Sequence, residues 1–202
     1  MYPEKGYTQE IRKNVMEEDI KKACEIMQKG GIILYPTDTI WGIGCDATNP
    51  DAVKRVYEIK KRTDSKALII LVDKESKVEF YVEDVPEIAW QLIELSEKPL
   101  TIVYDKGRNL AENLLAEDGS VGIRITKENF SKKLCDRFRK AIVSTSANIS
   151  GEKSPVNFGE ISDEIKKAVD YIVSYRQEDF STPAPSSVIK LGKGGLIQIL
   201  RP

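Results

Sequence analysis

The chain contains no histidine, and this absence excludes much of the usual enzyme chemistry. Triads that pair a serine or cysteine with histidine, histidine proton shuttles and most zinc sites all need an imidazole. Any reaction here must use lysine, arginine, hydroxyl groups, carboxylates or a metal that arrives with the substrate. We therefore expect no metal site built by the chain itself.

Paired cysteines and long apolar runs are also absent. Cys24, Cys45 and Cys135 lie far apart, which argues against a metal knuckle or redox motif and suits the reducing cytosol. No apolar run is long enough to span a membrane, and the first twenty residues lack the apolar core of a signal peptide. These absences predict a cytoplasmic protein without membrane contact.

Charge is nearly balanced, and the length suits one domain. The chain has 202 residues, of which 31 are basic and 32 acidic, with a net charge of −1. This balance argues against a protein that coats nucleic acid by bulk charge, although it leaves a local basic groove open. We predict a single domain over residues 1–202, with its core at about 14–201.

Helix and strand patterns alternate along most of the chain. Apolar residues recur at helical spacing over 20–27 and stop at Gly30-Gly31, a pair suited to ending a helix. Asn49-Pro50-Asp51 predicts the start of a second helix. Further helices are expected from about Pro86 and over 130–138, the latter capped by Thr126, and strands over 32–35, 68–72, 101–104, 121–125 and 141–143, with a hairpin of 187–191 and 196–200. The pattern predicts an α/β fold with a mixed sheet.

Two strand exits are rich in small polar residues. Tyr35-Pro36-Thr37-Asp38-Thr39-Ile40-Trp41-Gly42-Ile43-Gly44 follows one strand, and Ser144-Thr145-Ser146-Ala147-Asn148 follows another. Small hydroxyls and glycines let a backbone lie against a polar ligand, although hydroxyls also satisfy ordinary turns. Because ligands of α/β sheets gather beyond strand ends, we expect a site there.

Other motifs have simpler interpretations. Residues 42–47 match the dinucleotide fingerprint, but the helix signal comes too late at Asn49-Pro50 for that fold. Lys60-Lys61-Arg62 at a helix end can merely complement the helix dipole. A second basic cluster is interpreted as a solvated face and comprises Lys132, Lys133, Arg137, Arg139 and Lys140.

Taken together, the ordered motifs resemble the YrdC/Sua5 family of threonylcarbamoyl-AMP synthases, in its short single-domain form. The similarity covers nearly the whole chain. The matching pieces are Pro-Thr-Asp-Thr-x-Trp-Gly-x-Gly from Pro36, Lys60-x-Arg62, Lys98-Pro99-Leu100-Thr101, Val121-Gly122-Ile123-Arg124, Ser144 to Asn148, Pro185-Ser186-Ser187 and Leu200-Arg201-Pro202.

This resemblance implies a YrdC-like fold, with a twisted mixed sheet and helices around a concave cavity. It also implies synthesis of threonylcarbamoyl-AMP and pyrophosphate from L-threonine, bicarbonate and ATP, and use of the product by a transferase complex that modifies adenosine 37 of tRNA. By motif position, the threonine side would hold Thr39, Arg124 and Ser187. The nucleotide side would hold Lys60, Arg62, Lys66, Ser120, Ser144, Ser146, Asn148, Ser154 and Arg201.

Such a reaction suits a chain without histidine. The amine of threonine takes up carbon dioxide or bicarbonate, and an oxygen of the carbamate attacks the α-phosphate of ATP and expels pyrophosphate. The protein has only to align the reactants and neutralise charge. We predict Lys60 and Arg62 as catalytic residues, helped by Arg201 and by Mg²⁺ carried with ATP, and Arg124 as the ligand of the substrate carboxylate.

Two departures from the family pattern leave alternatives open. Where the family usually has proline, Asn-Pro-Leu and a histidine, this chain has Thr63, Lys66-Ala67-Leu68 and Leu71. One alternative is a divergent paralogue that acts on another carbamoyl or nucleotide compound. The other is a module for double-stranded RNA, in which Lys60, Lys61, Arg62 and Lys66 line a groove.

Overall fold

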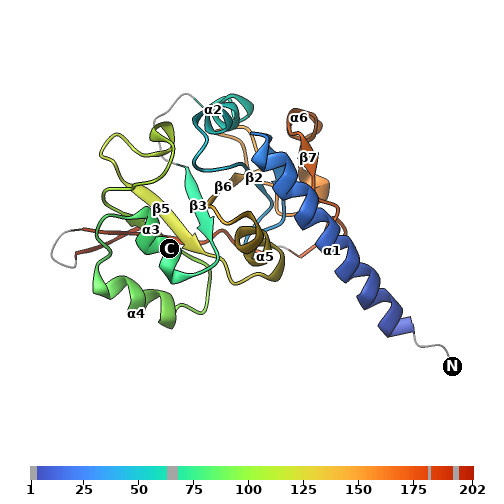
Figure 1. Cartoon of the computed structure of the whole chain (residues 1–202), viewed down its shortest axis with the longest axis horizontal. Helices are drawn as coiled ribbons and strands as arrows, with labels where there is room; N and C mark the ends of the chain where they lie inside the picture. Colours follow the sequence, from blue (N-terminus) through green and yellow to red (C-terminus); the bar gives the residue numbers. More distant parts are fainter. Residues whose placement is uncertain (1–3, 63–67, 182, 193–195) are drawn as a thin grey trace.

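A nine-stranded mixed sheet forms the centre of the described protein, in the order β7-β1-β2-β6-β3-β5-β4-β8-β9 (Figure 1). The computed structural model describes residues 4–62, 68–181, 183–192 and 196–202. The strands are β1 (Ile33–Tyr35), β2 (Gly42–Gly44), β3 (Ile69–Val72), β4 (Leu100–Tyr104), β5 (Val121–Ile125), β6 (Ile142–Ser146), β7 (Tyr171–Ile172), β8 (Ser187–Leu191) and β9 (Ile197–Arg201). The predicted α/β class with a mixed sheet is confirmed.

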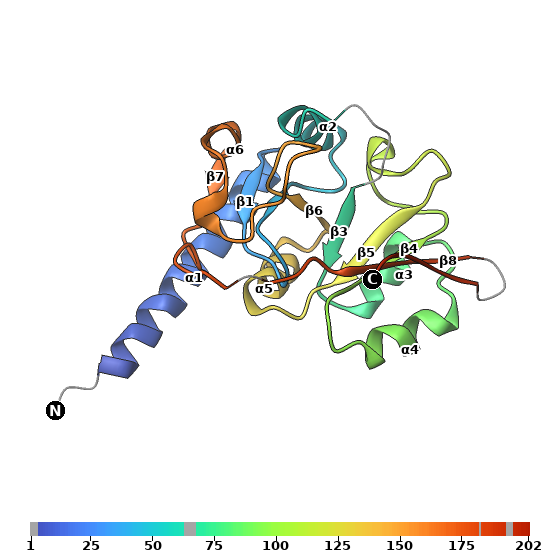
Figure 2. The ribbon, with the colours of Figure 1, turned by 180° about the vertical axis from the view of Figure 1, so that it is seen from behind.

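Helices cover one face of this sheet. The helices are α1 (Glu4–Gln28), α2 (Pro50–Ile59), α3 (Glu75–Tyr81), α4 (Glu87–Leu95), α5 (Asn129–Phe138) and α6 (Asp163–Ala168), with 3₁₀ turns at Glu112–Leu114 and Phe158–Glu160. α1 and α5 lie in front of the sheet in Figure 1 and α4 runs below it, whereas the view from behind in Figure 2 looks onto β1, β6, β3 and β5 without a helix across them. We call this helix-free side the open face of the sheet.

The strand and helix predictions agree closely with the structure. β1, β3, β4 and β5 lie within one residue of the predicted bounds, and α2 begins at Pro50 with Asn49 as its N-cap. α1 ends before Gly30, whose φ of +79° favours glycine, but it begins at Glu4, far earlier than the apolar spacing indicated. Figures 1 and 2 show its N-terminal half extending past the rest of the molecule.

Two local predictions were wrong. Thr126 does not cap α5, because its hydroxyl contacts Ser131 at 2.7 Å, while the carboxylate of Glu128 accepts from the backbone N–H groups of Phe130 and Ser131. The strand predicted over 141–143 continues to Ser146, because Ser144 to Ser146 pair with β3 and β2 rather than form a turn. Hydroxyl residues fit a strand when a neighbouring backbone supplies the hydrogen bonds.

Packing accounts for one of the two glycines in β2. A Cβ on Gly44 would lie 2.6 Å from the ring of Tyr35 and 2.8 Å from the carbonyl oxygen of Val143. The Tyr35 hydroxyl donates to that same carbonyl at 3.1 Å. Gly44 thus makes room for a core tyrosine rather than for a ligand. The dinucleotide interpretation fails as expected, because residues 42–44 form a strand and the next helix, α2, begins only at Pro50.

The predicted terminal hairpin is confirmed as β8 and β9, which pair antiparallel, and residues 193–195 of its turn lie outside the described residues. A bulge interrupts this pair: Ile189 faces Ile199, but Val188 faces Arg201, so Leu200 is an extra residue. A one-residue bulge reverses the alternation of side chains beyond it. Arg201 therefore shares the face of Val188, whereas Ile199 shares the face of the buried Ile189.

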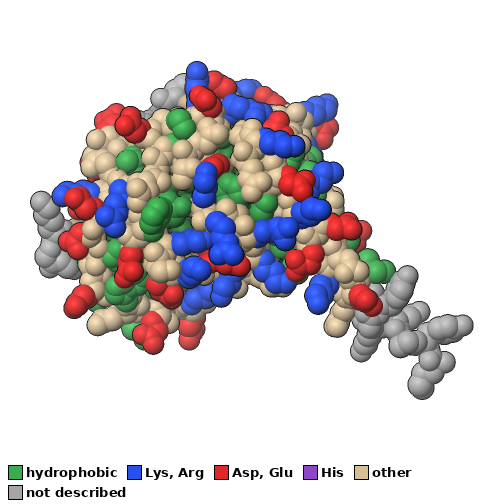
Figure 3. Space-filling view, in the orientation of Figure 1, with side chains coloured by type: hydrophobic (Ala, Val, Ile, Leu, Met, Phe, Trp, Pro, Cys, Tyr) green, Lys and Arg blue, Asp and Glu red, His purple; other side chains and the backbone are tan. Residues whose placement is uncertain are grey.

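The helix-covered face carries mixed charge. Figure 3, seen from the side of Figure 1, shows lysines and arginines interspersed with acidic residues. Lys133 of α5 pairs with Glu17 at 2.8 Å, and Lys140 pairs with Asp46 at 2.6 Å. This arrangement agrees with the interpretation of the second basic cluster as a solvated face. Within the described ranges, no helix is both long and apolar enough to cross a membrane.

Candidate active site

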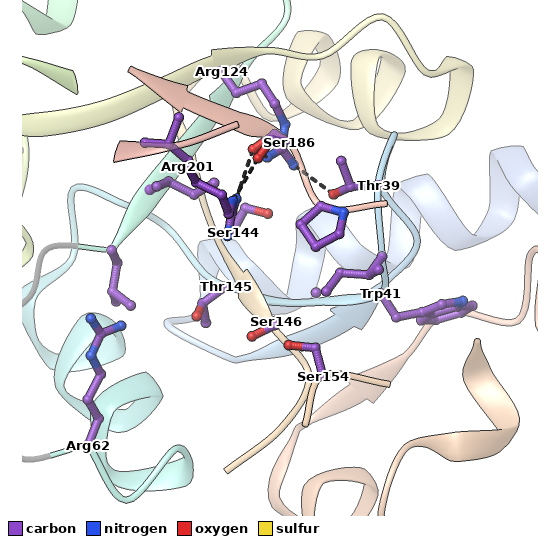
Figure 4. A pocket seen from close by; sticks show the side chains of 16 residues that line it. Thr39, Trp41, Arg62, Arg124, Ser144, Thr145, Ser146, Ser154, Ser186 and Arg201 are labelled. Atoms are coloured by element: carbon purple, nitrogen blue, oxygen red, sulfur yellow. Dashed lines mark hydrogen bonds between the residues drawn. The ribbon is translucent and has the colours of Figure 1, made fainter. Parts of the chain in front are cut away.

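The open face of the sheet holds a pocket lined by residues from both halves of the chain (Figure 4). Its wall consists of Thr39, Ile40, Trp41, Gly42, Arg62, Leu68, Ile69, Arg124, Ser144, Thr145, Ser146, Ser154, Pro185, Ser186, Val188 and Arg201. Seven of the predicted site residues are therefore brought together. The pocket lies on the sheet at β2, β6 and β3, and residues 39–42 after β1 and Arg201 at the end of β9 contribute to its wall.

Arg124 of β5 is a buried cation surrounded by hydroxyls. Only 3% of it is exposed, and its Nη1 donates to Ser186 at 3.3 Å and to Thr101 at 3.5 Å. Its Nη2 donates to Thr39 at 3.3 Å and lies 3.0 Å from a carboxylate oxygen of Asp38. These hydroxyl contacts are long for bonds to a charged donor, so a carboxylate could replace them.

Two atoms of this cluster have no hydrogen-bond partner among the described residues. They are Nε of Arg124 and Oδ1 of Asp38, whose ion pair is close but poorly aligned for a hydrogen bond. Burial raises the pKa of Asp38, while the charge of Arg124 opposes the rise. A buried guanidinium with an unused N–H is a feature expected of a ligand site.

Arg201 approaches the same hydroxyl from the edge strand. Its Nε donates to the Ser186 carbonyl at 2.8 Å, and its Nη2 donates to the Ser186 hydroxyl at 3.2 Å. Partial burial, followed by the charge of Arg124, lowers the pKa of Arg201. Two guanidinium groups thus converge on Ser186, an arrangement that an anion would stabilise.

The floor between the arginines is formed by β6. Ser144 pairs with Ile69 and Ser146 with Gly42, so both serines lie on the pocket face. A Cβ on Gly42 would lie 3.5 Å from the Ser144 hydroxyl and 3.3 Å from the Thr145 carbonyl oxygen. Glycine here leaves the Ser144 hydroxyl open to the pocket, so Gly42 fits the expected role of the glycines and Gly44 does not.

Arg62 lies at the opposite end of the pocket from Arg124 (Figure 4). It follows the end of α2, and its guanidinium lies 6.0 Å from the ring centre of Tyr57. Lys60, two residues earlier, is absent from the pocket wall, because its ammonium is buried against the carbonyls of Ser146 and Asn148. Lys61 points to solvent and pairs with Glu164 at 2.6 Å.

The remaining predicted residues that the structure describes are not part of the pocket wall. Asn148 holds the following loop, since its amide donates to Glu152 O at 2.9 Å and accepts from Ser154 at 3.4 Å. Ser120 is buried beside Asp118, and Ser187 begins β8 next to the pocket residue Ser186. Lys66, like Thr63, lies outside the described residues.

Sequence reasoning missed several contributors. Ser186 was within the matched Pro-Ser-Ser motif, but its neighbour Ser187 was chosen. Asp38 and Thr101 also belonged to matched motifs. Both contact Arg124, but no sequence signal indicates that these residues lie together. The rings of Trp41 and Phe158 contact each other at a tilt, with centroids 4.9 Å apart, and so tie the loop after Ser154 to the pocket wall. Among the described residues, no cluster of acidic or cysteine side chains could hold a metal ion.

Comparison with known proteins identifies relatives over most of the chain. A family model named for Sua5, YciO and YrdC and described as "Telomere recombination" matches residues 25–202. A putative threonylcarbamoyl-AMP synthase of Methanocaldococcus jannaschii is 36% identical over 91% of this chain and 87% of its own. A threonylcarbamoyl-AMP synthase of Pseudoalteromonas translucida is 31% identical, over 78% of this chain and 86% of its own.

Solved structures of related proteins have a similar fold. P. abyssi Sua5 in complex with L-threonine has a TM-score of 0.81 at 26% identity, over 91% of this chain. The chain spans about half of that protein, 53% of its length. E. coli YciO has a TM-score of 0.78 at 25% identity, over 90% of this chain and 87% of its own. With its sheet order, its motifs and these matches, the chain belongs to the Sua5/YciO/YrdC family.

Proposed function

We propose that this protein is an L-threonylcarbamoyladenylate synthase, which makes threonylcarbamoyl-AMP and pyrophosphate from L-threonine, bicarbonate and ATP. The observation that carries the proposal is a pocket with a buried, incompletely bonded Arg124 at one end and Arg62 at the other. An amino acid carboxylate and a polyphosphate are both anionic, so one molecule of each fits between these cations. Relatives named threonylcarbamoyl-AMP synthase support the same assignment.

At the Arg124 end, we expect the threonine carboxylate to displace the long bonds to Thr39 and Ser186. This contact would hold the amine toward the serines of β6, where the carbamate forms. Arg62 at the other end, and Arg201 beside Ser186, would bind phosphate oxygens and stabilise the charge that develops as pyrophosphate leaves. The protein supplies alignment and charge rather than a nucleophile.

In this proposal, Mg²⁺ enters the site bound to ATP. The described residues offer no acidic cluster for a resident ion, which fits a metal bound by the triphosphate. Bound there, Mg²⁺ would neutralise phosphate charge. The product would pass to a transferase complex that modifies tRNA, in the cytoplasm.

Pyrophosphate release tests the proposal. The purified protein, given ATP, bicarbonate and Mg²⁺, should release pyrophosphate only when L-threonine is added, and less with L-serine. ATP binding without threonine-dependent turnover would favour the divergent paralogue, for which the apolar Leu71 beside Arg124 in the sheet is the relevant feature. The RNA module is disfavoured, because Lys60 is buried and Lys61 is paired instead of lining a groove with Arg62.

A further inference from the structure

Lys60 joins the end of α2 to the turn after β6. Only 3% of this lysine is exposed, and its Nζ donates to Ser146 O at 2.6 Å and to Asn148 O at 2.7 Å. The carbonyl of Lys60 in turn accepts from the backbone N–H of Ser150 at 2.9 Å. Three hydrogen bonds from one residue therefore hold residues 146–150 against the helix.

The turn held in this way carries pocket residues. Ser146 lies in the pocket wall, and Asn148 accepts a hydrogen bond from the hydroxyl of Ser154, another wall residue. Arg62 reaches the pocket from the same helix end, two residues after Lys60. The position of Lys60 consequently decides how the two serines lie relative to Arg62.

The geometry leaves Lys60 little capacity for phosphate. Two of its three N–H groups are directed at carbonyls, and the side chain is not part of the pocket wall. Burial lowers its pKa to about 8, and the nearby charge of Arg62 adds to the decrease. A lysine that neutralises a triphosphate has to face the pocket that holds it, and Arg62 and Arg201 line this pocket whereas Lys60 does not.

We propose that Lys60 is a positioning residue, which holds the turn 146–150 against α2 and leaves the phosphate contacts to Arg62 and Arg201. Its role in catalysis rests on the proposed function, but the hydrogen bonds that it provides can be tested without turnover. The proposal replaces the prediction from the sequence that Lys60 binds nucleotide directly.

Three variants separate hydrogen bonding from charge. Lys60→Met keeps bulk but donates nothing, Lys60→Gln donates without a charge, and Lys61→Met removes the neighbouring exposed charge as a control. Amide hydrogen exchange over residues 147–154 and ATP affinity by calorimetry are the readouts. We expect Lys60→Met to speed exchange there and weaken ATP binding at least about tenfold. Lys60→Gln should stay within about threefold of the parent in ATP affinity, and Lys61→Met should match the parent.

A direct phosphate contact gives the opposite pattern. Lys60→Gln would then lose as much ATP affinity as Lys60→Met, with exchange over 147–154 unchanged, and the proposal would be overturned. If Lys60→Met fails to fold, Lys60→Gln decides alone, because near-parental affinity supports positioning and a tenfold loss refutes it. Failure of the proposed function would be seen separately, as a parent protein without threonine-dependent pyrophosphate release.

Discussion

The two ends of the pocket hold their arginines differently. Arg124 lies on β5 between paired strands, 3% exposed and next to the carboxylate of Asp38, so its charge is part of the folded core. Arg62 follows the end of α2, half-buried, with the Tyr57 ring beside it. A buried, neutralised charge contributes to both folding and binding, whereas a charge at a helix end contributes chiefly to binding.

The largest expected effect is at the Arg124 end. Arg124→Ala should leave Asp38 as an unpaired buried anion and cost roughly 3–5 kcal/mol of unfolding free energy, measured by chemical denaturation. Threonine-dependent pyrophosphate release should disappear. The double variant Arg124→Ala with Asp38→Asn should regain most of the stability but no activity. A single variant as stable as the parent would contradict the assigned role of the ion pair.

The Arg62 end should respond in binding alone. Arg62→Ala removes a charge-assisted contact with phosphate, so ATP affinity measured by calorimetry should fall by roughly 1.5–3 kcal/mol, with the protein still folded. Lys61→Ala is the matched control, because this lysine is exposed and pairs with Glu164 away from the pocket. Equal ATP affinity in a folded Arg62→Ala protein would remove Arg62 from the site.

The bulge in β9 offers a smaller and more specific test. Insertion of one alanine between Leu200 and Arg201 would pair that alanine with Val188 and move Arg201 one position along the strand, onto the opposite face of the sheet. ATP affinity should drop by about 1.5 kcal/mol, as in Arg201→Ala, because either change removes one guanidinium from the pocket. Leu200→Ala keeps the extra residue and should bind like the parent. Parental affinity in the insertion variant would show that the register of β9 does not aim Arg201.

The smallest expected effect, counted per pH unit, is the change in unfolding free energy that the titration of Lys60 causes. Because its pKa of about 8 in the folded protein lies below the ordinary 10.5, the unfolded chain holds one more proton between these values. The free energy of unfolding should therefore rise with pH in that window, by up to roughly 1.4 kcal/mol per pH unit, relative to Lys60→Met. Denaturation of both proteins from pH 7 to 10 measures the difference. A constant difference over this range would refute the lowered pKa.

Local sequence signals predicted the elements well where local chemistry decides them. Asn49-Pro50 marked the start of α2 and Gly30 the end of α1, because caps depend on neighbouring residues only. Predictions were less accurate for segments whose conformation depends on a partner elsewhere in the chain. Ser144 to Ser146 look like a turn until β2 and β3 pair with them, and Thr126 looks like a cap until Glu128 takes that place.

The site residues likewise fall into those that a local motif predicts and those whose contacts it does not predict. Thr39, Arg62, Arg124, Ser144, Ser146, Ser154 and Arg201 could be named from their motifs, and the structure places all seven in one wall. The contact of Asp38 with Arg124 and the burial of Lys60 could not be predicted, because both depend on residues more than eighty positions apart in the sequence. A charged side chain carries no local sign of whether it faces solvent or a distant carbonyl.

By itself, the sequence determined the fold class, the main helices and strands, the exclusion of histidine chemistry and the residues from which the pocket is built. Only the tertiary structure decided which of those residues face the pocket. Sheet pairing placed Ser186 between Arg124 and Arg201, a single bulged residue turned Arg201 inward, and two backbone carbonyls kept Lys60 out of the wall. The physical reason is that orientation depends on strand register and on distant hydrogen-bond partners, which no local pattern records.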